Sequence, residues 1–75
     1  METKPRTHAQ IRREGAAQDL KRNREKLGLT QEEAANRIGV VRSTYCRYEN
    51  GTVTPKMGVA RKIQERFAVP MESWA

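Results

Sequence analysis

The chain has 75 residues, which is enough for one small domain. Its formal net charge of +6 favours a polyanionic partner, and its single cysteine fits a reducing compartment. One cysteine excludes an internal disulfide, and the sequence lacks the cysteine and histidine pairs of metal sites. With His8 as the only histidine and no paired carboxylates, we expect no enzyme, no cofactor and no metal, and no apolar run reaches the roughly 18 residues of a membrane span.

Residues 1–15 contain Ile11 as their one large apolar residue besides Met1. They cannot bury enough apolar surface to order themselves, so we predict a flexible basic arm here, with at most a short helical extension around residues 10–14. The folded domain is expected over residues 16–75.

From Ala16 the pattern becomes helical, because Ala16, Leu20 and Leu27 recur at spacings of four and seven while charged residues occupy the other faces. These three residues should form the buried stripe of a first helix. Gly28 should end this helix, since glycine readily adopts the left-handed conformation that closes a helix.

The segment LTQEE, residues 29–33, predicts the start of a second helix. The Thr30 side chain can accept a hydrogen bond from the amide three residues on, and Glu33 can reach back to the Thr30 amide, which together form a capping box. Gly39 should end this helix after only a few turns.

Thr54 as cap and Pro55 as first-turn residue should begin a further helix that runs to about Phe67. Its buried stripe should consist of Val59, Ile63 and Phe67. Residues 70–74 add at most one terminal turn. No segment alternates with period two over a useful length, so the sequence predicts an all-α chain.

Between these segments a third helix is predicted over about residues 42–49, joined to the second by a tight turn at Gly39. At about 100° per residue, four basic or small side chains fall within an arc of about 140°, with Tyr45 and Tyr48 opposite on the core side. The four are Arg42, Ser43, Cys46 and Arg47. Two helices that cross at a tight turn predict a helix-turn-helix, whose second helix enters the DNA major groove.

We expect these four residues to read DNA bases. Arginine can bridge guanine O6 and N7, and serine can contact either type of base. For Cys46, contact with a thymine methyl group and a redox switch that blocks binding are both open. The basic residues of the arm, which suit either a DNA minor groove or a solvated tail, are Lys4, Arg6, Arg12 and Arg13.

The segments LKRNREKLGLTQEEAANRIGV, RSTYCRYENG and TPKMGVARKIQERFAVPMESW resemble the Cro and repressor (Xre-type) helix-turn-helix proteins of phages and bacteria. The resemblance covers residues 18–74. The combination that carries it is Gln31, Ala35, Gly39, Val40, Glu49 and Gly51 at these spacings. It implies a compact bundle of four to five helices, lambda-repressor-like, that acts in the bacterial cytoplasm or nucleoid.

The resemblance also implies roles for single residues. Arg24 and Glu49 should form a structural pair across the fold. Val41 departs from the family, which usually has a capping Ser, Thr or Asn there, so the third helix could begin later, at Ser43 or Thr44. Contacts to DNA phosphates are implied for Gln31, Thr44, Asn50, Thr52 and Lys56.

We therefore expect a sequence-specific double-stranded DNA-binding transcriptional regulator, most simply a repressor that occupies an operator overlapping a promoter. It should bind a pseudo-palindromic operator as a homodimer, formed in part on DNA, because one module reads few base pairs. The candidate dimer contacts near the C-terminus are Val69, Met71 and Trp74, although Trp74, like the two tyrosines, also reads as a core residue. The alternatives are an antitoxin that also grips a toxin protein through residues 1–15, and a protein-binding helical adaptor.

Overall fold

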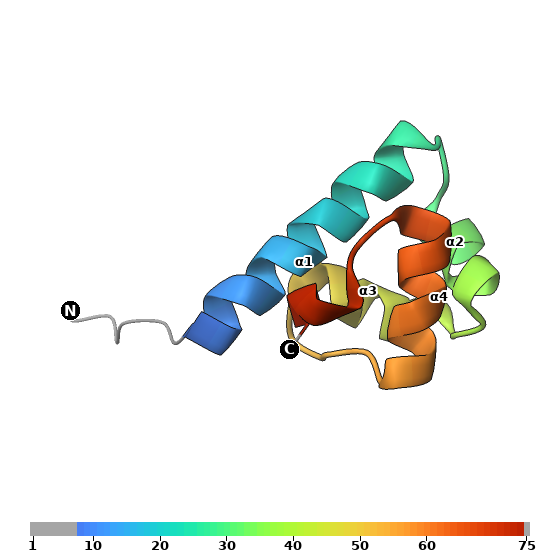
Figure 1. The fold of residues 1–75 in the computed structure, drawn as a ribbon. Coiled ribbons are helices and arrows are strands. Elements are labelled where there is room, and N and C mark those ends of the chain that lie inside the picture. Colours follow the sequence, from blue (N-terminus) through green and yellow to red (C-terminus); the bar gives the residue numbers. More distant parts are fainter. Residues whose placement is uncertain (1–7, 75) are drawn as a thin grey trace.

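The computed structural model describes residues 8–74. Within them the chain forms α1 (His8–Lys26), α2 (Gln31–Ile38), α3 (Arg42–Asn50), α4 (Met57–Phe67) and one 3-10 turn, η1 (Met71–Trp74). The described residues contain no strand, so the predicted all-α fold is confirmed. Figure 1 shows α1 lying along the other helices, with its N-terminal turns extending beyond them.

The core lies where α1 to α4 and η1 meet. Tyr45 of α3 packs on Phe67 of α4 with ring centroids 6.4 Å apart, and Tyr48 of α3 packs on Trp74 of η1 at the same separation. The largest fully buried side chains are Tyr45, Phe67, Leu20, Ile38, Ile63 and Val69. The prediction that both tyrosines and the tryptophan are core residues is therefore confirmed.

The predicted capping box begins α2. The Thr30 hydroxyl accepts a hydrogen bond from the Glu33 amide at 3.1 Å, and the Glu33 carboxylate accepts one from the Thr30 amide at 2.9 Å. Gly39 ends the helix with φ 72°, the left-handed conformation expected for it. Both ends of α2 are thus fixed by contacts within one turn of the chain, and only residues 39–41 separate it from α3.

α1 begins eight residues before the start predicted at Ala16. The predicted short extension around residues 10–14 belongs to this helix, so residues 8–15 are not a separate flexible arm. Ala16 and Ala17 are buried, and a Cβ atom on Gly51 would lie 3.9 Å from Glu14 Cα, so α1 packs against the end of α3 over these residues. Once this part is helical, each further residue extends the helix at little cost. The predicted arm over residues 1–7 lies outside the described residues.

Two further expectations were wrong. Leu27 does not join the buried stripe of α1: it follows the last helical residue and is 57% exposed. α4 starts at Met57, with Lys56 at the N-cap, and not at Thr54 and Pro55. Pro55 is buried and lines the same groove as Ala60 and Trp74, so packing holds it in the loop before the helix begins.

Candidate nucleic-acid interface

α3 presents three of the predicted base-reading side chains to solvent. Arg42, Ser43 and Arg47 are exposed, while Tyr45 and Tyr48 on the opposite side are buried. The helix begins at Arg42, so the later starts considered at Ser43 and Thr44 were wrong. Two arginines and a serine on one open helix face can form the hydrogen bonds that distinguish base edges in a major groove.

The residue that precedes α3 caps it poorly. Val41 occupies the N-cap with an extended backbone, φ −75° and ψ 154°, but valine has no side-chain oxygen to accept a hydrogen bond from the first turn. Its side chain is 66% exposed beside Arg42. The helix nevertheless starts here, because Tyr45 and Tyr48 anchor its inner face in the core.

Cys46 is placed differently from the other three candidates. Its side chain is only partly exposed, and its thiol donates a hydrogen bond to Oε1 of Gln31 at 3.1 Å. The contact turns the sulfur toward the start of α2, whereas the helical periodicity of about 100° per residue predicted an outward orientation. That periodicity describes α3 alone, but the contact depends on how closely α2 crosses α3.

Gln31 bonds with α3 at both ends of its amide. While Oε1 accepts from Cys46, Nε2 donates to Oε1 of Glu49 at 3.2 Å. The residue is half-buried at the first position of α2. One of the two Nε2 hydrogens is used by Glu49, and the second remains for another acceptor such as a DNA phosphate.

Arg24 of α1 and Glu49 of α3 form the expected pair. Arg24 Nε donates to Glu49 Oε2 at 2.7 Å and its Nη2 donates to Oε1 at 3.3 Å, while Nη1 donates to the Leu29 carbonyl at 2.8 Å. The side chains are 12% and 3% exposed, respectively. This pair joins α1 to α3 and to the turn before α2, so it has a structural role and does not add positive charge to the outer face of α3.

The electrostatic surroundings keep this carboxylate charged. Burial opposes ionisation of Glu49, but hydrogen bonds from Arg24 and Gln31 outweigh it and lower the pKa of the carboxyl. The bond to Glu49 likewise raises the pKa of Arg24. The buried Tyr45 hydroxyl approaches the same carboxylate, although it makes no hydrogen bond of ordinary geometry among the described residues, and burial raises its pKa. The site therefore holds an ion pair next to a neutral phenol.

The remaining phosphate candidates differ in exposure. Asn50, Thr52 and Lys56 are exposed at or beyond the C-terminal end of α3, whereas Thr44 is half-buried. The Thr52 hydroxyl donates to the Arg47 carbonyl at 3.3 Å, which holds the loop against the helix end. Their contacts to DNA stay a prediction.

Two of the three proposed dimer contacts are not available on the surface. Val69 and Trp74 are 0% and 3% exposed, so both side chains already belong to the core of one chain. That expectation was wrong for them. Only Met71 is half-exposed, and it lines a groove together with Met57, which is 77% exposed.

A family model described as "Helix-turn-helix" matches residues 20–74. The chain belongs to the Xre-type helix-turn-helix family. The match spans the C-terminal part of α1 together with α2, the turn at Gly39, α3, α4 and η1. The exposed arginines of α3 thus lie on the second helix of the helix-turn-helix that gives this family its name.

Three relatives illustrate the membership. The chain is 46% identical over 43 residues to the cryptic phage CTXphi transcriptional repressor RstR of Vibrio cholerae, covering 57% of this chain and 39% of that protein. It is 45% identical over 48 residues to the HTH-type regulator YqaF of Bacillus subtilis, covering 64% and 63%. It is 43% identical over 44 residues to an HTH-type regulator of Methanothermobacter thermautotrophicus, covering 59% and 64%.

The chain therefore spans about two fifths of the phage repressor and slightly less than two thirds of the other two relatives. No solved structure gave a significant match. The family to which the chain belongs is one of HTH-type transcriptional regulators, and these are not enzymes. The names of these relatives give no support to an antitoxin or an adaptor.

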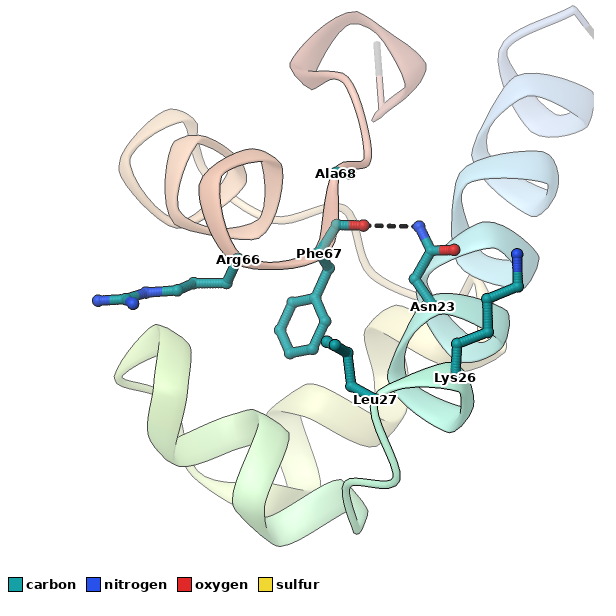
Figure 2. Close-up of a pocket in the computed structure, with 6 residues that line it drawn as sticks. All are labelled: Asn23, Lys26, Leu27, Arg66, Phe67 and Ala68. Atoms are coloured by element: carbon teal, nitrogen blue, oxygen red, sulfur yellow. Dashed lines mark hydrogen bonds between the residues drawn. The ribbon is translucent and has the colours of Figure 1, made fainter.

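This helix-turn-helix protein also has a small hollow away from α3. Figure 2 shows it between the C-terminal ends of α1 and α4, where Asn23 Nδ2 donates to the Phe67 carbonyl at 2.6 Å. Its volume is about 240 Å³, and Leu27, Lys26 and Arg66 line it. Over residues 8–74 there is no cluster of three potential metal ligands, and no helix is long and apolar enough to cross a membrane.

Proposed function

We propose that this protein binds double-stranded DNA sequence-specifically and reads the major groove with α3. The observation that carries the proposal is the division of α3 into two faces, one buried through Tyr45 and Tyr48 and the other open with Arg42, Ser43 and Arg47. The buried face fixes the rotation of the helix. The arginines then occupy defined positions, which base recognition requires.

In this proposal each arginine bridges O6 and N7 of a guanine, and Ser43 contacts a neighbouring base edge. Gln31 binds a phosphate through its second Nε2 hydrogen. Further backbone contacts come from Thr44, Asn50, Thr52 and Lys56. The net charge of +6 makes the affinity fall steeply as salt rises, because bound phosphates release their counterions.

We further infer that the protein is a repressor. This rests on similarity to one relative that is named a phage transcriptional repressor, and on a simple mechanism that needs no second domain. A bound regulator that covers part of a promoter excludes RNA polymerase from it. The site of action would then be the cytoplasm or nucleoid of the cell that carries the operator.

A homodimer is proposed on a pseudo-palindromic operator. One helix-turn-helix module buries roughly 600–1,000 Å² and reads few base pairs, which is little for selecting one genomic site. Two copies on half-sites about one helical turn apart double the base contacts. Since Val69 and Trp74 are buried, the contact is proposed to lie at Met57 and Met71, which line one groove near the C-terminal turn.

The decisive experiment is selection of bound sequences from a random DNA pool, followed by binding measurements on the selected operator. Arg42→Ala and Arg47→Ala should each weaken specific binding by about 1–3 kcal/mol and relax the preference at one base position. Arg22→Ala is the matched control, because Arg22 is exposed on α1 and pairs with Asp19. Circular dichroism should be unchanged in all three variants.

Two results would contradict the proposal. If both α3 variants bind the operator like the wild type, α3 is not the reading helix. If the wild type binds no DNA even at low salt, a protein-binding adaptor becomes the better account. Sedimentation with the operator should reveal two chains per duplex, and a one-to-one complex on a single asymmetric site at saturating protein would rule out the dimer.

A further inference from the structure

The two hydrogen bonds of the Gln31 amide define its orientation. The Glu49 carboxylate can only accept hydrogen bonds, so Nε2 of Gln31 must face it, as the 3.2 Å distance indicates. Oε1 then faces the Cys46 thiol, which is a donor, at 3.1 Å. A flipped amide would set its oxygen against the carboxylate oxygens of Glu49, and it would lose the hydrogen bond that the thiol donates to Oε1. The network therefore favours one orientation of a side chain that is otherwise flexible.

Glu49 is itself fixed from the other side. Its carboxylate receives Arg24 Nε at 2.7 Å and is 3% exposed, so it cannot move to follow Gln31. A chain of hydrogen bonds thus connects Arg24 of α1 to Glu49 of α3, Glu49 to Gln31 of α2, and Gln31 to Cys46 of α3. The position of Gln31 relative to the reading helix is determined by two residues of that helix, Cys46 and Glu49.

We propose that Cys46 is a positioning residue for DNA binding, whose thiol holds the Gln31 amide with its second Nε2 hydrogen toward a DNA phosphate. Cys46 accordingly does not read a base. The inference rests on the proposed function and on the phosphate contact assigned there to Gln31. The advantage is pre-organisation, since a long side chain that is already held in place loses less conformational entropy when it meets its ligand.

The thiol suits this role by its size and its place. Cys46 is half-buried between α2 and α3, one turn after Arg42 and directly before Arg47. A small donor fits there without displacing either arginine. Cys46→Ala removes the thiol donor with little change of side-chain volume. Cys46→Ser restores a hydrogen-bond donor, the hydroxyl, on a Cβ–Oγ bond that is shorter than Cβ–Sγ. These two substitutions therefore separate hydrogen bonding from packing.

The experiment uses the full chain and a set of selected operators in which single phosphates are replaced by neutral methylphosphonates. For Gln31→Ala we expect about tenfold weaker binding, together with loss of sensitivity to replacement of one particular phosphate. Cys46→Ala should bind about threefold more weakly and lose part of the sensitivity at the same phosphate. Cys46→Ser should recover most of both, and the base preferences of all three variants should equal those of the wild type.

A double-mutant cycle completes the test, because residues that act through one contact are not additive. In the Gln31→Ala background, Cys46→Ala should cause no further loss. Additive losses, an altered base preference in Cys46→Ala, or wild-type binding by that variant would each overturn the positioning role while leaving the DNA-binding function intact. If the wild type selects no operator at all, the proposed function fails, and this inference fails with it. Unchanged melting temperatures would show that the variants are folded.

Discussion

The guanidinium of Arg24 and the carboxylate of Glu49 are joined by two hydrogen bonds, of 2.7 and 3.3 Å, although the residues are 25 positions apart in the sequence. The pair links α1 to α3 beneath the outer face of α3. A buried pair of this kind need not add net stability compared with apolar residues, but it makes each partner depend on the other. It therefore fixes how α3 is set against the longest helix of the fold.

We predict that Arg24→Ala and Glu49→Ala each lower the free energy of unfolding by about 3–5 kcal/mol, because each leaves a buried charge without its partner. The double variant should lose less than the sum of the two. Urea unfolding followed by circular dichroism measures all three. As a control, Arg22→Ala breaks an exposed pair with Asp19 and should cost at most about 1 kcal/mol. If the two losses in the free energy of unfolding are strictly additive in the double variant, Arg24 and Glu49 are not energetically coupled.

Stability should also depend on pH through Glu49. Because the folded protein lowers the pKa of this carboxyl below its ordinary value of 4.5, the unfolded chain binds its proton first as the pH falls. The stability that this group contributes is present above about pH 4.5 and is lost as the pH drops through the lower folded pKa. The difference in melting temperature between the wild type and Glu49→Gln should therefore shrink in acid.

Part of the acid sensitivity should persist in Glu49→Gln. The backbone hydrogen bond from Thr30 lowers the pKa of Glu33, so that carboxyl contributes with the same sign. Glu33→Gln is consequently the matched comparison. If the stability gap between wild type and Glu49→Gln stays constant from pH 7 to about pH 3, Glu49 does not titrate at a lowered pKa.

The N-cap of α3 offers a gain in stability. Val41 has an extended backbone suited to capping but no oxygen to accept from the first turn, so Val41→Ser should raise the free energy of unfolding by about 0.5–2 kcal/mol. Val53→Ser, in the loop after α3, is the control and should give no such gain. Thermal unfolding at neutral pH measures both. Equal effects of the two substitutions would mean that the gain does not come from capping.

Trp74 should matter for folding more than for assembly. It is 3% exposed and packs on Tyr48, so Trp74→Ala should destabilise the chain by about 3–5 kcal/mol. Trp74→Phe should cost less, because the buried indole Nε1 finds no hydrogen-bond partner among the described residues. Ile11→Ala, at an exposed position of α1, is the control. If Trp74→Ala keeps the stability of the wild type and loses only cooperative binding to DNA, then Trp74 acts in the dimer interface and not in the core.

The elements that the sequence predicted correctly depend on contacts within about one helical turn. The capping box of Thr30 and Glu33 and the left-handed Gly39 involve residues at most four apart, so local patterns are sufficient to identify them. The outward face of α3 follows from the same periodicity, since Tyr45 and Tyr48 must be buried. The pairing of Arg24 with Glu49 is not local, and it was implied only by resemblance to a family.

Only the tertiary structure determined the contacts that depend on how the helices cross. The sequence by itself determined that the fold is all-α, how α2 begins and ends, and that Arg42 and Arg47 lie opposite the tyrosines of α3, because these features rest on backbone geometry and on the spacing of apolar residues. It could not determine that Cys46 turns to Gln31, that Val69 and Trp74 fill the core, or that α1 packs on the end of α3 from as early as Glu14. Each of these depends on the distance between elements far apart in the chain, and that distance is set by the packing of all the helices together.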